Sequence, residues 1–257
     1  MPHISYSELK NWEQCAYKHK LVNIDKINNF TGNEYTAFGT ALHSVCENLL
    51  TENLGKKVDE GELFVQEFRK EVNKLDVELR KDMIISMFEQ GVKIAPIVIP
   101  LIREHFGDFE VFAAEEKLYE DIEGLDYKFK GFIDLVFKTE DGKLHIMDYK
   151  TCSWGWGKKQ KTDKMLAYQL VLYKHFFAQR YEIDPNDIEV HFCLLKRTAK
   201  KNVVEVFSIT SGEKRTNNAL ELMTRAIKTI KNKVHIKNKL ACTKGYGCEF
   251  YKTEHCK

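Results

Sequence analysis

The chain has 257 residues, of which 43% are hydrophobic and 30% are charged, with 14 Gly and 4 Pro. This composition is typical of a globular protein and excludes a disordered chain, a collagen-like chain or a small disulfide-rich protein. The 40 Lys and Arg residues nearly balance the 38 Asp and Glu residues, so any nucleic-acid-binding surface must be local.

The first residues lead directly into a polar helix start, without the apolar segment of a signal peptide. The longest apolar run, residues 94–102, has about half the length that a membrane span requires. It also contains Pro96 and Pro100. We therefore expect a soluble, cytoplasmic protein with no membrane partner. In such a compartment the seven cysteines favour reduced thiols or metal ligands over disulfides.

The first 106 residues are expected to be mostly helical. Ser5 followed by Glu8 is a capping-box pattern, which predicts a helix that continues to Tyr17 and includes Cys15. Apolar residues at helical spacing predict three more helices. These lie at 35–50, 60–79 and 82–105, and the last is expected to be kinked or broken at its prolines.

From residue 109 onward, period-2 and continuous apolar patterns predict strands. The expected strands are 109–122, 127–138, 144–151, 188–196 and 203–209. Further helices are expected at 163–181 and 211–235. The fold class is therefore α/β, with a mixed central sheet flanked by helices, a helical N-terminal region and a cysteine-rich C-terminal tail. We expect one domain over residues 1–257, with a helical insertion at 51–106 and the tail at 240–257.

Acidic and basic side chains gather on the predicted hairpin. Alternation along a strand places Asp148 and Lys150 on one face and Tyr149 on the other, and Asp134 can join them from the neighbouring strand. Carboxylates of this kind suit Mg²⁺ or Mn²⁺, and a nearby lysine can assist an attacking water. Taken alone, Asp-Tyr-Lys fits an ordinary surface ion pair better than a catalytic site. The wider order of motifs favours catalysis.

That order is Gly39-x-x-x-His43, Gly131-x-x-Asp134, Asp148-x-Lys150 and Gln169-x-x-x-Tyr173. In this order of motifs the chain resembles the PD-(D/E)XK nuclease superfamily, specifically the RecB-like exonuclease branch that includes Cas4 and AddB nuclease domains. The resemblance extends from the Ser-x-Ser-x-x-x-x-Trp-x-x-Cys opening to the cysteine-rich end, and it implies a restriction-endonuclease-like core. The proline of the family signature is absent, since Asp134 follows Phe132-Ile133.

The resemblance implies a role for each matching residue. His43, Asp134 and Asp148 would be metal ligands, and Lys150 would be the catalytic lysine. Gln169 and Tyr173 would organise the site and the DNA. Glu115 and Glu116 lie where such nucleases often add another acid, and the sequence does not choose between them.

Cysteines form a second group. Cys15 near the start and three cysteines in the tail, Cys242, Cys248 and Cys256, match the one-plus-three count of the iron-sulfur members of this branch. The resemblance implies a 4Fe-4S cluster, although the tail spacing is wider than usual. Two alternatives remain: a zinc site, in which His255 could replace one thiolate, and free thiols with Cys15 packed as an apolar residue. The other three cysteines, Cys46, Cys152 and Cys193, are expected to pack as small hydrophobic residues.

A lysine-rich loop at 153–164 follows the predicted catalytic strand. Its Trp154 and Trp156 are expected to be exposed and to stack on unpaired bases, while the lysines neutralise phosphates.

We therefore expect a Mg²⁺- or Mn²⁺-dependent deoxyribonuclease, an exonuclease acting on single-stranded DNA or duplex ends in recombination, repair or DNA processing. A helicase or recombination protein is an expected partner. The alternative is a catalytically weak or inactive nucleic-acid-binding or adaptor protein with the same fold and a structural cysteine-metal site. An RNA-directed enzyme is less favoured, because no reader of the 2′-hydroxyl is identifiable.

Overall fold

The structure is a computed structural model, and it describes residues 1–27, 32–52, 56–243, 245 and 247–256. The predicted insertion and tail therefore each include residues outside the described ranges. Two compact units are distinguished by their internal contacts. Unit 1 comprises Met1–Phe30, Leu118–Gly131 and Glu213–Lys257, and unit 2 comprises Thr31–Lys117 and Phe132–Gly212. That the whole chain forms one domain stays a prediction.

Unit 1 is mostly helical. Its elements are β1 (His3–Ser5), α1 (Tyr6–Gln14), α2 (Ala16–His19), the π-helix η1 (Lys20–Ile24), α8 (Glu213–Lys231) and the 3₁₀ helix η3 (Lys239–Cys242). β1 pairs in parallel with the first residues of β3. The predicted capping box is confirmed, because the Ser5 side chain accepts from the Glu8 backbone and the Glu8 side chain accepts from the Ser5 backbone. Helices α1 and α8 are joined by a hydrogen bond from Trp12 Nε1 to Thr229 Oγ1 of 2.8 Å.

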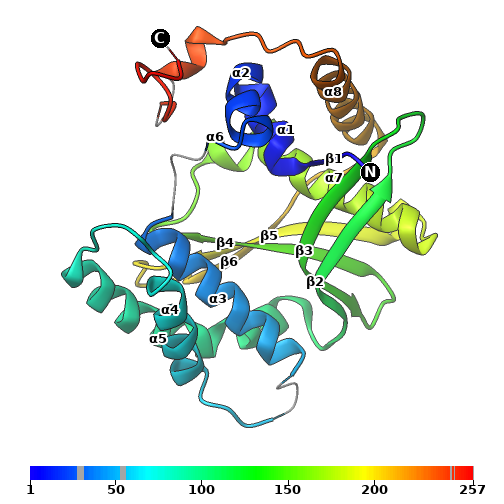
Figure 1. Cartoon of the computed structure of the whole chain (residues 1–257). Coiled ribbons are helices and arrows are strands. Elements are labelled where there is room, and N and C mark those ends of the chain that lie inside the picture. Colours follow the sequence, from blue (N-terminus) through cyan, green and yellow to red (C-terminus); the bar gives the residue numbers. More distant parts are fainter. Residues whose placement is uncertain (28–31, 53–55, 244, 246, 257) are drawn as a thin grey trace. The chain divides into compact units, whose positions relative to one another are not determined.

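Unit 2 contains a mixed sheet between helices (Figure 1). Its helices are α3 (Glu34–Leu50), α4 (Glu60–Val72), α5 (Lys81–Phe106), α6 (Lys158–Lys161), α7 (Lys164–Tyr181) and the 3₁₀ helix η2 (Pro185–Asp187). Its strands are β4 (Leu144–Cys152), β5 (Ile188–Lys196) and β6 (Val204–Ser208). Two more strands, β2 (Phe109–Asp121) and β3 (Lys128–Thr139), begin or end in unit 1.

Strand order and direction follow from the connections. The order is β3-β4-β5-β6, and β2 also pairs with β3. β3 and β4 form an antiparallel hairpin through the predicted turn at Asp141-Gly142, and β5 and β6 are likewise antiparallel. β4 and β5 are parallel because α7 carries the chain back between them. This is the mixed, helix-flanked sheet expected from the sequence.

The main core of unit 2 lies between the sheet and helices α3, α4 and α5. Alternate residues of the strands point into it, among them Leu135, Met147, Tyr149 and Cys193. α7 packs against the opposite face of β4 and β5, where the side chains that alternate with the core residues point. Asp148 is one of these side chains. One strand therefore supplies the apolar core with every second side chain and the opposite face with the others.

One helix prediction is wrong, and one of the two alternatives given for another helix is excluded. Cys15 does not lie inside a helix: it has extended backbone angles (φ −166°, ψ 115°) and separates α1 from α2. The helix at 82–105 is not broken, since α5 runs continuously through Pro96 and Pro100. Burial of its Ile94 and Val98 in the core compensates for the missing backbone donors.

α5 is the one helix among the described residues that is long and apolar enough to cross a membrane, by length and composition alone. Its buried face packs against α3 and α4. This packing accounts for the apolar residues on that face.

Candidate active site and cysteine cavity

The end of β4 presents an acid and an amine on the same face of the sheet. Asp148 is 2% exposed, and its Oδ2 lies 2.5 Å from Lys150 Nζ. Tyr149, between them in sequence, is buried on the opposite face within the main core. The alternation predicted for Asp148, Tyr149 and Lys150 is therefore what the strand adopts.

Asp134 lies on β3, the antiparallel partner of β4. Its Oδ2 accepts a hydrogen bond of 2.7 Å from the Tyr149 backbone N–H, which fixes the carboxylate at the hairpin. His43 approaches from α3, with Nδ1 3.6 Å from the same oxygen. Its ring also makes an edge contact with the Tyr149 ring, at a centroid distance of 5.6 Å.

Gly39, one turn before His43, allows α3 to approach β4. A Cβ atom at Gly39 would lie 3.0 Å from Thr151 Oγ1, which directly follows Lys150 in sequence. A larger residue would therefore require Thr151 or the helix to shift. The Gly-x-x-x-His spacing sets the distance from which His43 reaches Asp134.

Helix α7 supplies the third part of the site. Gln169 is buried, and its Nε2 donates to Asp148 Oδ1 at 2.7 Å. The same nitrogen lies 3.3 Å from the Tyr173 hydroxyl. Gln169 thus holds one Asp148 oxygen while Lys150 contacts the other. The i, i+4 pair on α7 acts on the carboxylate through its glutamine.

The charges in this cluster perturb one another. Burial raises the pKa of Asp148 to about 6. The positive charge of Lys150 lowers this pKa, and the negative charge of Asp134 raises it. Burial also opposes ionisation of Asp134, but His43, Lys150 and the Tyr149 N–H together hold its pKa below the usual range. Burial would lower the pKa of His43, yet its contact with Asp134 raises the net value. The cluster holds two carboxylates beside two basic groups.

Further acids lie near the cluster, and one of them was missed in the sequence. Glu47 is one helical turn after His43 on α3, and its pKa is raised by burial, by Glu115 and also by Asp134. The i, i+4 relation to His43 was the available signal. Glu116 faces elsewhere, since its Oε1 accepts 2.7 Å from the Tyr181 hydroxyl. Of Glu115 and Glu116, Glu115 is therefore the acid whose charge acts on Glu47, beside the cluster.

The positive backbone angle of Glu115 (φ 51°) marks an irregularity within β2. Such a residue re-aims its side chain relative to a regular strand.

The three predicted metal ligands come close in part. His43 and Asp134 are in contact. In the described part of the chain, however, the ligand atoms of His43, Asp134 and Asp148 do not all lie within 4.8 Å of one another. The donor types still suit a hard divalent cation, whose positive charge would favour the ionised form of the buried Asp148.

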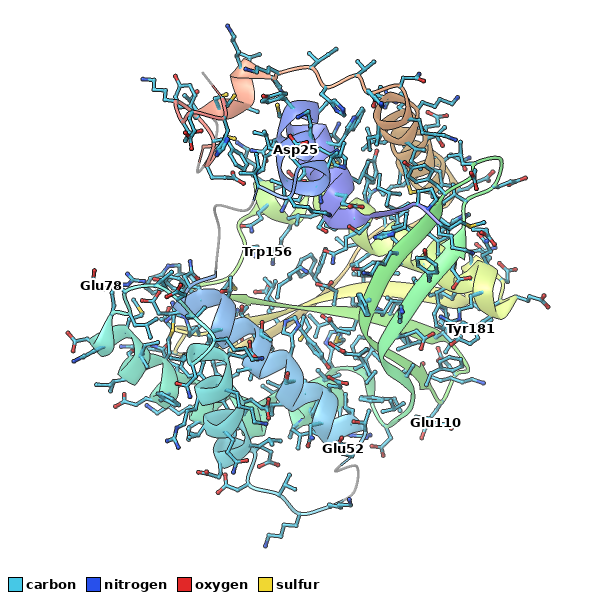
Figure 2. All side chains as sticks on the ribbon, in the orientation of Figure 1. Asp25, Glu52, Glu78, Glu110, Trp156 and Tyr181 are labelled. Atoms are coloured by element: carbon cyan, nitrogen blue, oxygen red, sulfur yellow. The ribbon has the colours of Figure 1, made fainter. Side chains whose placement is uncertain are left out.

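The loop after β4 differs from expectation. Trp154 is 78% exposed, as predicted. Trp156, labelled in Figure 2, is half-buried and packs edge-on against Phe192 and Phe207, so the prediction that both tryptophans are exposed is wrong. Lys161 forms an ion pair with Glu205, which leaves less of the loop's charge available.

The four cysteines singled out in the sequence line one cavity of about 370 Å³ in unit 1. Cys15 Sγ accepts a hydrogen bond of 3.3 Å from the Asn238 backbone N–H. Lysines also line this cavity: Lys18, Lys237, Lys239 and Lys252. His255 is not among the lining residues. The structure thus brings Cys15 together with Cys242, Cys248 and Cys256.

The remaining cysteines pack mostly as expected. Cys46 and Cys193 are fully buried in the core of unit 2, and burial raises the pKa of both thiols. Cys152 is only half-buried.

Comparison with known proteins decides the family. The model of the PD-(D/E)XK nuclease superfamily matches residues 3–256. The chain belongs to this superfamily. It is therefore a nuclease with the restriction-endonuclease-like fold, and PD-(D/E)XK nucleases typically use divalent metals. The roles of His43, Asp134, Asp148 and Lys150 within that fold stay predictions.

Solved structures agree with the PD-(D/E)XK fold. The chain is similar to a protein from Eubacterium rectale described as a putative exonuclease, with a TM-score of 0.61 and 12% identity over 94% of this chain and 86% of that one. At such identity the likeness shows the fold alone. A second structure, SSO0001, has a TM-score of 0.34 and 14% identity over 86% and 84% of the two chains, which is too low to carry an argument. No curated protein matches the chain.

Proposed function

We propose that this nuclease is a divalent-metal-dependent exonuclease that hydrolyses phosphodiester bonds of single-stranded DNA or duplex ends. The observation that carries the proposal is the Asp148–Lys150 pair, held at the end of β4 beside Asp134 and braced by Gln169. An acid, a second acid and a lysine on one face of a sheet are the groups that metal-assisted hydrolysis needs.

Each residue has a distinct task in this proposal. Asp134 and Asp148 bind the cation with His43, and Gln169 keeps Asp148 oriented. The bound cation supplies Lewis acidity and lowers the pKa of a water. Lys150 donates to the attacking water or to the scissile phosphate, where negative charge develops during in-line attack. The product would carry a 5′-phosphate, as the resemblance to RecB-like nucleases implies.

Preference for unpaired DNA is supported by the loop after β4. Trp154 is largely exposed within a few residues of Lys150, and an exposed tryptophan can stack on a base. The Eubacterium rectale protein that shares this fold is described as a putative exonuclease, and we propose the same mode of action for this chain.

The test uses end-labelled single-stranded and duplex DNA, with linear and covalently closed circular forms, in Mg²⁺ or Mn²⁺. Shortening of linear DNA with sparing of closed circles supports exonuclease action. Cleavage of closed circles would replace it with an endonuclease. DNA binding without cleavage in either metal would favour the adaptor alternative, and degradation of RNA in preference to DNA would overturn the substrate class.

We also propose that the cavity in unit 1 holds a 4Fe-4S cluster on Cys15, Cys242, Cys248 and Cys256. All four thiols line the cavity, and no three of them have sulfur atoms within 4.8 Å of one another among the described residues. Tetrahedral zinc requires neighbouring sulfurs about 3.8 Å apart. A four-iron cluster holds its thiolates farther apart, because each binds a different iron. The lining lysines would balance its negative charge.

Anaerobic purification tests this second proposal independently of cleavage. A brown protein with about four iron and four sulfide per chain is expected for a 4Fe-4S cluster. Zinc without iron would support the zinc alternative instead, and a metal-free protein would leave the thiols free. The proposed roles in recombination or repair and the proposed helicase partner rest on the resemblance alone.

A further inference from the structure

We propose that His145, His191 and Glu189 form a second metal site in unit 2, for a borderline divalent cation such as Zn²⁺. The three residues lie where the parallel strands β4 and β5 begin, and each offers one ligand atom within 4.8 Å of the other two. The site is separate from the candidate nuclease residues. It does not depend on the proposed DNA substrate.

The distances between ligand atoms suit such an ion. His145 Nδ1 lies 3.0 Å from His191 Nε2, and His191 Nε2 lies 3.9 Å from Glu189 Oε2. Zinc bonds of ordinary length place neighbouring tetrahedral ligands about 3.3 Å apart. The two observed distances lie on either side of that value. Two imidazoles and one carboxylate also leave an open coordination position.

Strand register explains why these side chains meet. His145 is paired with Glu189 across the two parallel strands, and His191 follows two residues later on the same face as Glu189. His145 is 5% exposed and His191 is 2% exposed. The two rings are thus held close together in the interior, whereas Glu189 extends toward the surface.

Hydrogen bonds fix the orientation of the first ring. Thr139 Oγ1 donates to Asp141 Oδ1 at 2.5 Å, so its lone pair must accept from His145 Nε2, 3.0 Å away. His145 therefore carries its proton on Nε2 and directs the Nδ1 lone pair toward His191. A metal-binding histidine in proteins usually donates its outer N–H in this way.

The second ring has the matching arrangement. His191 Nδ1 lies 3.1 Å from Ser208 Oγ, a hydroxyl that can donate or accept by rotation. Without a cation, one proton on His191 Nε2 bridges the rings. A bound cation would take the place of that proton, and Ser208 would accept from His191 Nδ1.

The carboxylate is also positioned for this role. Lys143 Nζ binds Glu189 Oε1 at 2.8 Å, which leaves Oε2 as the oxygen nearer to His191. A cavity of about 310 Å³ opens beside His145, and Thr139 and Asp141 line it as well.

The test titrates the chelator-treated full-length protein with Co²⁺, in an Asp148→Asn background that removes a ligand from the nuclease site. A site with two histidines and a carboxylate should give strong visible bands without the near-ultraviolet thiolate band of cysteine ligands. We expect about one equivalent bound. Zn²⁺ should displace the cobalt and raise Tm.

Matched variants locate the site. Glu189→Gln removes the partly exposed ligand with little risk to folding, and it should weaken Co²⁺ binding at least tenfold. Ser208→Ala should weaken it about tenfold by removing the outer partner of His191. Asp187→Asn makes the same charge change at an exposed position two residues before Glu189 and should have no effect.

Absence of cobalt bands in the folded protein would overturn the proposal and leave a purely hydrogen-bonded chain from Ser208 to Asp141. Bands that persist unchanged in Glu189→Gln and Ser208→Ala would place the ion elsewhere and overturn it equally. A thiolate band would assign the cobalt to cysteines.

Discussion

The candidate nuclease site and the cysteine cavity are built in different ways. In unit 2, strand pairing and packed helices fix Asp134, Asp148 and Gln169 through hydrogen bonds of 2.7 Å each. In unit 1, Cys242 lies at the end of a short 3₁₀ helix, and the other three thiols lie in irregular segments. The candidate nuclease site is therefore formed by the fold itself. The second would gain its rigidity from the group that it binds.

The largest effect is expected at Lys150. Lys150→Ala should lower kcat for DNA cleavage about 10³-fold, because the group that meets the developing charge is lost. Single-turnover cleavage of labelled DNA measures this. Lys138→Ala, an exposed lysine on β3, is the matched control and should cleave normally. Normal cleavage by Lys150→Ala would remove the lysine from the mechanism.

The cysteine cavity should respond in stability instead. Cys248→Ser should abolish iron binding and lower Tm by about 5–15 °C, since a cross-link between distant segments is lost. Iron analysis and calorimetry check both effects. Cys152→Ser changes a half-buried thiol outside the cavity and should retain the iron. Retention of full iron content by Cys248→Ser would exclude it as a ligand.

Gln169 sharpens the distinction between binding a cation and orienting its ligand. Gln169→Leu should raise the Mg²⁺ concentration for half-maximal activity about tenfold, because Asp148 Oδ1 loses its donor. Tm should change much less than activity. Tyr173→Phe should have a smaller effect, as the hydroxyl lies 3.3 Å from Gln169 and acts through it. Equal metal dependence in wild type and Gln169→Leu would make the residue structural only.

The smallest effect concerns the stability of unit 2 alone. The side-chain and backbone hydrogen bonds of Arg80 lower the pKa of Glu34 to about 2. The unfolded chain therefore binds the proton first on acidification. The stability from this pair is complete above pH 4.5 and is lost as the pH falls toward 2.

Glu34→Gln should thus lower Tm by about 3–6 °C at pH 7, from the loss of about 1–2 kcal/mol in charged hydrogen bonds. The difference from wild type should shrink between pH 4.5 and pH 3. Thermal melts at several pH values measure it, with Glu78→Gln at an exposed position as the control. A difference that stays constant with pH would contradict the assignment.

Local patterns predicted the parts of the site that depend on local geometry. Alternation along one strand was enough to place Asp148 and Lys150 on one face, and helical spacing related Gly39 to His43. Hydrophobic periodicity also gave the helices and strands of the mixed sheet within a few residues, apart from the short β1 and α6 and an α4 that ends at Val72.

Contacts between distant segments could not be read in the same way. The meeting of His145 with His191 depends on the register of two parallel strands, which no local pattern fixes. Likewise, the break at Cys15 interrupts a segment whose residues favour a continuous helix. Trp156 was misjudged because its burial is decided by Phe192 and Phe207, which come from other strands.

The interleaving of residues on β4 has a consequence for heat inactivation. Met147 and Tyr149 anchor the strand in the core, and Asp148 and Lys150 alternate with them along the same few peptide units. The strand therefore cannot release its reactive side chains by fraying while the core stays folded. On heating, catalytic activity should be lost in the same cooperative transition in which the core of unit 2 unfolds. No compact but inactive species should form before that transition.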